Sequence, residues 1–416
     1  MFITGLTAKE FRNLQQPSFC PCQGVNLLYG GNGQGKTSLL EALWMFTGLT
    51  SFRTNRAAEI IRFGSSVCQA TLEFLRDERE QQAQLEIRRQ PTRRRFWVNG
   101  VPRQPGSPEL SFSMVLFTPD DLGLLKNGPV QRRELLDTVL CQLYPRYRKN
   151  LSEYQRCLAQ RNTLLKAAAK SGQDQRVQNQ SLLEVLDAAL SKLGVYLVRE
   201  RASLTGRLAF HADRLYQRIS GGNEKLAVCY QSGAFPASVR REQGDFSVYR
   251  EEVSGSRPEA SVQDADALNA QAQAILASGR EGLELSFYDL LQSRRKADLG
   301  AGFTTAGAHR DDLVLLLNGR SARLFGSQGQ QRTAALCCRL GAAELLYELS
   351  GERPVVLLDD VLSELDDDRK RVVWDTVTQN QIFLTGCDEA YFSQLPAAGR
   401  QVRLFRVQEG QVFRTG

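Results

Sequence analysis

The sequence has few residues of the kinds that build a zinc site or a disulfide framework. Among 416 residues there are two histidines, His211 and His309, and nine cysteines, an odd number with no C-x-x-C pair. The closest cysteines, at 20 and 22 and at 337 and 338, have no histidine at the spacing of a zinc site. We therefore expect free, mostly buried thiols in a reducing cytosol.

Long apolar segments are also missing. No apolar run approaches the roughly 18 residues of a membrane span, and no N-terminal stretch has the charged flank and apolar core of a signal peptide. We expect a soluble cytoplasmic protein, long enough for two lobes and an insertion. The net charge of +7 is compatible with a nucleic-acid partner and equally with a basic enzyme that binds none.

A glycine-rich turn follows an apolar segment near the N-terminus, and its sequence has the pattern G-x-x-x-x-G-K-T. Such a turn directs backbone N–H groups at phosphate oxygens, and the dipole of the following helix adds to their pull. Lys36 would reach the β- and γ-phosphates, and Thr37 would place its hydroxyl on Mg²⁺. The expected phosphate-binding residues are Gly30, Gly31, Asn32, Gly33, Gln34, Gly35, Lys36, Thr37 and Ser38.

Strands and helices alternate at the two ends of the chain. We expect strands at 2–11, 25–29, 67–75, 84–88, 313–317, 354–360 and 382–385, and helices at 37–48, 327–349 and 367–379. The near-continuous apolar runs at 354–360 and 382–385 predict parallel strands buried on both faces. The fold class is therefore α/β, with a mixed or parallel sheet.

The middle of the chain has helical periodicity. Two segments, 147–170 and 178–219, predict a projecting antiparallel helical pair joined by a polar turn at 171–174, too short and irregular for a coiled-coil arm. Residues 233–262 predict a polar loop, and 263–299 a further helix. The expected domains are an ATPase lobe in two parts, 1–135 and 301–416, and a helical insertion domain, 136–300.

Two adjacent carboxylates end the apolar strand at 354–360. Asp359 suits a metal ion and Asp360 suits a water molecule, because phosphoryl transfer depends on positioning and charge neutralisation. The alternative, a strand-end cap, leaves two buried carboxylates without a cation, which is costly. A helix beginning at Ser327-Gln328-Gly329-Gln330-Gln331 offers a second anion-binding N-terminus, although many helices begin with serine.

An arginine-rich hairpin is predicted around Asn99-Gly100, a pair typical of two-residue turns. Arg93, Arg94 and Arg95 precede Phe96 and Trp97 in this segment. A basic ribbon with aromatic residues can follow a phosphate backbone. A solvated strand face explains the same pattern.

The order and spelling of the motifs resemble a known family. A phosphate loop, a helical insertion, S-Q-G-Q-Q-R, then D-D and S-E-L-D resemble the ABC-type ATPase head of chromosome-maintenance (SMC) proteins. In detail the chain resembles the RecF family of DNA replication and repair proteins. The segments that carry this resemblance are 11–14, 30–37, 117–122, 131–137, 307–312, 327–332 and 359–366; 140–300 matches little.

The resemblance implies roles for individual residues. Ser327, Gln328, Gly329, Gln330 and Gln331 would contact the γ-phosphate of a second subunit, and Asp366 would border that interface. Arg12 and Asn13 would join the ATP site, although an ordinary turn explains them too. Asp360 stands at the position of a catalytic glutamate, with a shorter reach. The function of the switch histidine of transporters is either missing here or performed by Thr385. His309 and Arg310 lie in a family motif, where they either pack within the protein or contact a ligand.

The resemblance also implies a function. We expect an ATP- and Mg²⁺-dependent homodimer that binds double-stranded DNA at gaps, hydrolyses ATP slowly, works with RecO and RecR in loading RecA, and associates with the nucleoid. An SMC-like head with a separate nuclease is the alternative, but it should carry long heptad arms and a C-x-x-C hook. A transporter subunit would lack the long insertion, and a metabolic kinase would not need 327–332 or 363–366.

Overall fold

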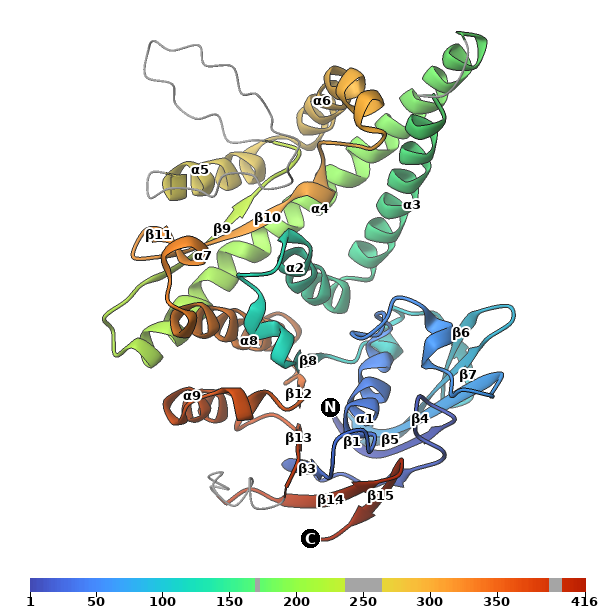
Figure 1. The fold of residues 1–416 in the computed structure, drawn as a ribbon, viewed down its shortest axis with the longest axis vertical. Helices are drawn as coiled ribbons and strands as arrows, with labels where there is room; N and C mark the ends of the chain where they lie inside the picture. Colours follow the sequence, from blue (N-terminus) through green and yellow to red (C-terminus); the bar gives the residue numbers. More distant parts are fainter. Residues whose placement is uncertain (169–172, 236–263, 389–398) are drawn as a thin grey trace. The chain divides into compact units, whose positions relative to one another are not determined.

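The computed structural model describes residues 1–168, 173–235, 264–388 and 399–416. They form two compact units (Figure 1). The first comprises Met1–Gly123, Cys141–Pro145 and Ala335–Gly416, and the second Leu124–Leu140 and Arg146–Ala334. Unlike the expected boundaries, this division gives the segment 301–334, with the S-Q-G-Q-Q motif, to the helical unit. Most of the predicted loop at 233–262 and part of the turn at 171–174 lie outside the described residues.

The central sheet of the first unit has the order β15-β14-β3-β13-β12-β8. Its strands are β3 (Val25–Tyr29), β8 (Met114–Phe117), β12 (Val355–Leu358), β13 (Ile382–Gly386), β14 (Val402–Gln408) and β15 (Gln411–Arg414). All neighbours pair in parallel except β15, which is antiparallel to β14. The predicted mixed or parallel sheet is thus confirmed, with three strands, β8, β14 and β15, that were not predicted.

A second, antiparallel sheet has the order β2-β1-β4-β5-β6-β7. Its strands are β1 (Phe2–Lys9), β2 (Ser18–Phe19), β4 (Val67–Arg76), β5 (Arg79–Arg88), β6 (Arg93–Val98) and β7 (Val101–Arg103). The predicted hairpin is present, and its turn residues Asn99 and Gly100 both have positive φ. Strand β5 begins five residues before the predicted start at 84, because the turn at Asp77 and Glu78 tightens the connection to β4.

Helices cover both faces of the central sheet, α9 (Asp367–Val377) on one side and α1 (Lys36–Trp44) on the other (Figure 1). One hydrophobic core joins α1 to both sheets, with Leu6, Leu40, Leu72 and Phe383 almost completely buried. Burying such side chains contributes about 2 kcal/mol each. The core thereby fixes the helix that follows the phosphate loop.

The second unit is built on long helices. They are α3 (Pro145–Ala168), α4 (Gln173–Ser220), α5 (Asp264–Ala277), α6 (Arg280–Ala301) and α7 (Ala322–Phe325). Two more, α2 (Pro129–Leu143) and α8 (Gln328–Ser350), begin in this unit and end in the first. Its sheet has the order β11-β10-β9, with β9 (Leu226–Gln231), β10 (Asp312–Leu317) and β11 (Arg320–Ser321). Short 3-10 helices span Met45–Thr47, Ala57–Ile60, Pro108–Leu110, Pro119–Gly123, Ala308–Arg310 and Val361–Glu364.

One expectation for this unit is wrong, and one of its strands was not predicted. The single helix predicted at 263–299 is two helices, α5 and α6, because Gly279 has an extended backbone that interrupts the helical turns. Strand β9 was not predicted, and it pairs with β10 along its whole length. All nine cysteines are free and seven are buried, as expected. No helix in the described residues is long and apolar enough to cross a membrane.

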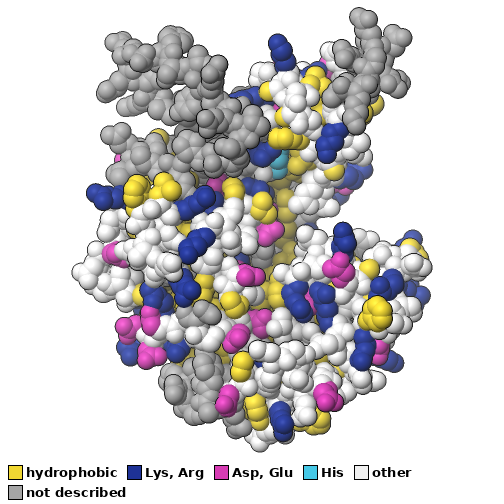
Figure 2. All heavy atoms as spheres, in the orientation of Figure 1, with side chains coloured by type: hydrophobic (Ala, Val, Ile, Leu, Met, Phe, Trp, Pro, Cys, Tyr) yellow, Lys and Arg dark blue, Asp and Glu magenta, His cyan; other side chains and the backbone are white. Residues whose placement is uncertain are grey.

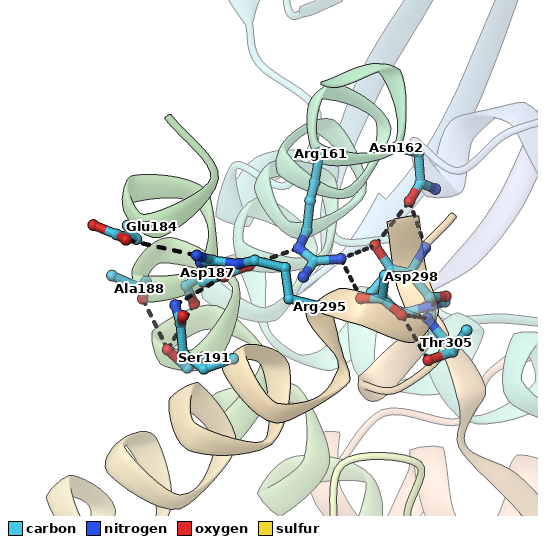
Figure 3. Close-up of polar contacts among 12 residues, drawn as sticks. Arg161, Asn162, Glu184, Asp187, Ala188, Ser191, Arg295, Asp298 and Thr305 are labelled. Carbon is cyan, nitrogen blue, oxygen red and sulfur yellow. Dashed lines mark hydrogen bonds and ion pairs between the residues drawn. The ribbon is translucent and has the colours of Figure 1, made fainter. Parts of the chain in front are cut away.

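A buried ionic network ties three helices of the second unit together (Figure 3). Arg161 on α3 donates to Asp187 on α4 and to Asp298 on α6, at 2.6 Å each, and all three side chains are 0% exposed. Arg295 donates to Asp187 at 2.7 Å, and Thr305 donates to Asp298 at 2.6 Å. Breaking such a network by removing one partner is strongly destabilising, because the remaining charge stays buried.

Candidate nucleotide-binding site

The predicted phosphate loop lies between β3 and α1, at the carboxyl edge of the central sheet. Gly30 and Gly35 have φ angles of 151° and 113°, which side chains with a Cβ rarely adopt. A Cβ on Gly30 would lie 2.2 Å from the carbonyl oxygen of Val407, and one on Gly35 would lie 2.8 Å from Leu14. Both glycines are therefore required by the turn and by the elements packed behind it.

The lysine of the loop curls back over the turn. Lys36 Nζ donates to the carbonyl oxygens of Gly30, at 2.6 Å, and of Gly31, at 2.9 Å. The ammonium group is therefore held above the concave side of the loop, beside the N-terminus of α1. From there the lysine can reach the β- and γ-phosphates of a bound nucleotide.

Side chains from other segments brace the loop. Asn13 donates to the carbonyl oxygen of Gly33 and accepts from Ser38 Oγ, both at 2.8 Å. Gln34 accepts backbone hydrogen bonds from the β14–β15 turn, at 2.6 Å from Glu409 N. Asn13, predicted here only through the family resemblance, thus contacts both ends of the phosphate loop.

The two adjacent aspartates lie next to Thr37. Asp359 Oδ1 accepts from Thr37 Oγ1 at 3.0 Å and from Thr385 Oγ1 at 2.9 Å. The backbone N–H of Asp360 donates to the same Thr385 oxygen at 2.9 Å. Thr385 is 1% exposed, so its hydroxyl links the ends of β12 and β13 without water. Asp359, Asp360 and Thr385 are therefore one hydrogen-bonded group behind the loop.

Burial raises the pKa of Asp359 above its ordinary value, while the hydrogen bonds from Thr385 and Thr37 oppose the shift. A nearby divalent cation would favour the ionised carboxylate. Among the described residues, no cluster of three His, Cys, Asp or Glu side chains could hold a metal unaided. Mg²⁺ on Thr37 and Asp359 would take its other ligands from phosphate groups and water, as Mg²⁺ does in nucleotide sites.

Asp360 and Asp366 lie in the segment after β12. Asp360 has a left-handed backbone, with φ 53°, and Ser363 Oγ donates to its carbonyl oxygen at 2.6 Å. Asp366 caps α9, since its carboxylate accepts from the backbone N–H of Arg369 at 2.9 Å. The contacts of Asp366 within the chain are those of a helix cap, and its expected place at a dimer interface stays a prediction.

Arg12 forms an ion pair that the sequence did not reveal. Its guanidinium donates three hydrogen bonds to Glu41 on α1, at 2.7, 3.0 and 3.2 Å, and a fourth to the carbonyl oxygen of Glu59. Glu41 is 0% exposed and also accepts from Ser51 Oγ at 2.5 Å. Within this unit Arg12 therefore stabilises the helix that carries the phosphate loop. No sequence pattern marked Glu41, because its partners lie far from it in the chain.

Helix α8, the predicted second anion-binding helix, begins at Gln328, one residue after its predicted start, and in the second unit instead of the expected ATPase lobe. Ser327 and Gln330 form a reciprocal capping box: the backbone N–H of Gln330 donates to Ser327 Oγ at 3.2 Å, and the backbone N–H of Ser327 donates to Gln330 Oε1 at 2.8 Å. Ser327 and Gln328 are exposed, and Gly329 is half-buried. Gln331 is buried, and its amide donates to the carbonyl oxygens of Arg323 and Gly326, so this side chain holds the preceding loop.

The segments 131–137 and 307–312 meet around one buried arginine, Arg201 on α4. It donates to Asp137 at 2.8 Å and to Asp311 at 2.7 Å. Asp311 also accepts from Tyr230 at 2.6 Å, and Arg132 pairs with Asp312 at 2.7 Å. The two segments are therefore parts of one buried polar network in the second unit.

His309 is part of the packing in that unit. Its Nε2 lies 3.0 Å from the carbonyl oxygen of Thr304, which can only accept, so Nδ1 accepts from the hydroxyl of Tyr154 at 3.0 Å. Burial lowers the pKa of His309 to about 4, and the positive charges of Arg310 and Arg133 lower it further. His309 is therefore neutral at physiological pH, which favours the packing alternative. Arg310 is exposed and stacks over Phe303.

The arginine-rich strand β6 presents its charges on two faces. Arg93 and Arg95 are exposed, whereas Arg94 turns inward and donates to the carbonyl oxygen of Leu49 at 2.8 Å. Figure 2 shows Lys and Arg side chains scattered among acidic ones on the visible face. Of the three predicted DNA-contacting residues, the two exposed ones retain a surface position suited to phosphate contact.

Comparisons with known proteins cover nearly the whole chain. A family model described as RecF/RecN/SMC N terminal domain matches residues 2–412. The DNA replication and repair protein RecF of Halothermothrix orenii is 32% identical, over 100% of this chain and 99% of the relative. RecF of Symbiobacterium thermophilum is 35% identical, over 99% of this chain and 98% of the relative.

Solved structures give the same answer for the fold. The recombination mediator protein RecF with ATP, of the RecFOR pathway, has a TM-score of 0.79 and 29% identity, over 100% of this chain and 98% of that one. An SMC head bound to a domain of ScpA has a TM-score of 0.51 at 12% identity, which shows a shared fold alone. The fold is that of an ABC-type ATPase head, and the chain belongs to the RecF family of DNA replication and repair proteins.

Proposed function

We propose that this protein is an ATP- and Mg²⁺-dependent DNA-binding ATPase that dimerises when it binds ATP. The observation that carries the proposal is the contact between Thr37 and Asp359 behind the phosphate loop, at 3.0 Å, with Lys36 held above the loop. These groups would bind Mg²⁺ and the β- and γ-phosphates. The ATP bound to the 29% identical RecF structure supports this assignment.

The second half of the site comes from another copy of the chain. Ser327 and Gln328 are exposed at the N-terminus of α8, where backbone N–H groups attract an anion. A γ-phosphate bound to one copy would meet this helix in its partner, so each ATP would favour the closed dimer. Asp360 would orient the attacking water. Hydrolysis would be slow in the monomer and would reopen the dimer.

The biological role follows from the same switch. A dimer that closes on ATP would grip double-stranded DNA near a gap, with Arg93 and Arg95 among the phosphate contacts. Hydrolysis, stimulated by DNA, would release it. Its partners would be RecO- and RecR-type mediators, and the outcome would be assistance in loading RecA. The RecFOR pathway named for the similar solved structures supports this proposal. A cytoplasmic, nucleoid-associated location would follow.

Nucleotide binding and sedimentation test the proposal together. Lys36→Met should abolish binding of a fluorescent ATP analogue, the ATP-induced shift from monomer to dimer, and DNA binding. Asp360→Asn should retain all three and trap the dimer. Ser327→Arg should leave analogue binding by the monomer unchanged but block dimer-dependent hydrolysis. If the Lys36 variant still dimerised with ATP, or the Ser327 variant hydrolysed ATP at the full rate, the proposal would be wrong.

A further inference from the structure

An acidic side chain lies against the S-Q-G-Q-Q motif, Ser327 to Gln331, at the N-terminus of α8. Glu224, in the turn between α4 and β9, accepts a hydrogen bond from Gln330 Nε2 at 2.5 Å. Its other carboxylate oxygen accepts from the hydroxyl of Tyr216, on the last turns of α4, at 2.8 Å. The motif is therefore connected through one carboxylate to the end of the longest helix in the second unit.

The turn that carries Glu224 is anchored on both sides. Asn318, in the β10–β11 turn, accepts from the backbone N–H of Lys225 at 2.9 Å, and its own N–H donates to the Lys225 carbonyl at 3.0 Å. The backbone N–H of Leu226 donates to Asp213 on α4 at 2.8 Å. Before Glu224, the backbone N–H of Asn223 donates to the carbonyl oxygen of Ser220 at 3.3 Å. Because the residues on both sides are held in this way, the scaffold sets the position of the Glu224 carboxylate.

Glu224 also decides which way the Gln330 amide faces. Gln330 Oε1 accepts from the backbone N–H of Ser327, and this contact requires the oxygen, not the nitrogen, to point at Ser327. A carboxylate can only accept, so it holds the NH₂ group on the opposite side. If the amide flipped, NH₂ would face the N–H of Ser327 and the carbonyl oxygen would face the carboxylate, and both contacts would be repulsive.

We propose that Glu224 is a positioning residue for the ATPase reaction, which locks the Gln330 amide so that Ser327 and the first turn of α8 are in place to receive the γ-phosphate of the partner copy. The inference rests on the proposed function, since it assigns a role within the composite site. In this role Glu224 acts through Gln330, and not on the nucleotide directly. Its chain position at the end of α4 also gives the helical unit a direct connection to the motif.

The expected effect is on closure and turnover, not on nucleotide binding by the monomer. Glu224→Ala removes the acceptor and frees the Gln330 amide to rotate, so dimer-dependent turnover should fall about tenfold, the effect of one charge-assisted hydrogen bond. Glu224→Gln retains an acceptor oxygen and should restore turnover to within about twofold. The binding of a fluorescent ATP analogue by the monomer should be unchanged in both, because the phosphate loop belongs to the first unit.

The experiment uses the full chain with Mg²⁺-ATP and a gapped duplex. Turnover and the ATP-induced dimer are measured for the wild type, Glu224→Ala, Glu224→Gln, and Glu281→Ala as a matched removal of an exposed acid from the first turn of α6. A double-mutant cycle with Gln330→Ala isolates the contact. Glu224→Ala should have no further effect on turnover once Gln330 is absent, and its melting temperature, compared with that of the Glu281 control, measures the stability lost with the Tyr216 and Gln330 contacts.

Several results would overturn the inference. Turnover by Glu224→Ala at or above the wild-type rate would show that the carboxylate does not support the motif. If Glu224→Ala lowered turnover by the same factor in the Gln330→Ala background, Glu224 would act on some other group. If Glu224→Gln did not restore turnover, the negative charge of Glu224 and not its hydrogen bond to Gln330 would be responsible. In each case an intact wild-type dimer leaves the proposed function standing. A wild type that does not dimerise with ATP overturns both.

Discussion

Replacing Thr385 by valine tests the hydrogen-bonded group behind the phosphate loop. Valine has nearly the shape of threonine, so Thr385→Val removes the hydroxyl without leaving a cavity. Asp359 loses one of its two side-chain donors, and the backbone N–H of Asp360 loses its acceptor, at a site that is 1% exposed. A hydrogen bond to a charged group contributes about 1.5–3 kcal/mol, and an orphaned buried N–H costs a similar amount. We therefore expect a total loss of roughly 3 kcal/mol, divided between folding and catalysis.

Turnover should show this loss most clearly. If half of this free energy is lost from the stabilisation of the transition state, the rate of ATP hydrolysis at saturating Mg²⁺-ATP falls on the order of tenfold. Removing the donor also raises the pKa of Asp359 further, so the deficit should grow as the pH falls and less of the carboxylate is ionised. Thr385→Ser, which retains the hydroxyl, is the control and should keep most of the activity and melting temperature.

The two variants together can refute this reasoning. Wild-type turnover in Thr385→Val would mean that the hydroxyl does not orient Asp359 or Asp360. Equal losses in the serine and valine variants would assign the effect to the methyl group and its packing. A deficit that does not change with pH would separate the role of Thr385 from the ionisation of Asp359.

Three further predictions concern the rest of the chain. His309 takes up a proton below about pH 6.5 in the unfolded chain but only below about pH 4 in the folded protein. The stability that the neutral side chain contributes is therefore complete above about pH 6.5 and is lost as the pH falls towards about 4. Thermal unfolding of the wild type, compared with that of His309→Gln, should show a relative loss of roughly 2 kcal/mol by about pH 5. Arg161→Met should destabilise the second unit by about 3–4 kcal/mol in calorimetry, whereas Arg156→Met, at an exposed site on the same helix, should change stability by less than about 0.5 kcal/mol. Reversing the charges of Arg93 and Arg95 together should make the plot of log affinity for DNA against log salt concentration less steep, by about one unit of slope for each DNA phosphate that the protein no longer neutralises. An unchanged slope would mean that β6 is a solvated strand that does not contact DNA.

Much of the phosphate site could be predicted because its parts are local in sequence. The loop of Gly30 to Thr37 follows a strand and precedes a helix, as its spacing predicts. Asp359 ends a fully apolar strand, and parallel strands bring their carboxyl ends to one edge of a sheet, so its approach to Thr37 follows from the pattern. The family resemblance added Asn13, whose contacts with Gly33 and Ser38 no local pattern predicts.

The parts that could not be predicted depend on long-range partners. Glu41 and Arg201 look like ordinary charged positions of a helix, and only the fold brings Arg12 to the first and Asp311 to the second. Strand β9 depends for its pairing on β10, which follows both α5 and α6 in the chain. The break at Gly279 was not predicted, because the sequence has helical periodicity on both sides of this residue.

The length of the Asp360 side chain has a conformational explanation as well as a chemical one. From the sequence, an aspartate at the place of a catalytic glutamate looks like a loss of reach. In the structure this residue has φ 53° and ψ 16°, a left-handed conformation in which aspartate is several-fold enriched over most side chains. Its N–H is fixed by Thr385 and its carbonyl oxygen by Ser363, so the backbone cannot relax into another conformation without breaking both contacts. The left-handed backbone of this turn therefore favours aspartate at position 360. Because its side chain is one methylene shorter than that of glutamate, the turn itself has to bring the carboxylate close to the attacking water.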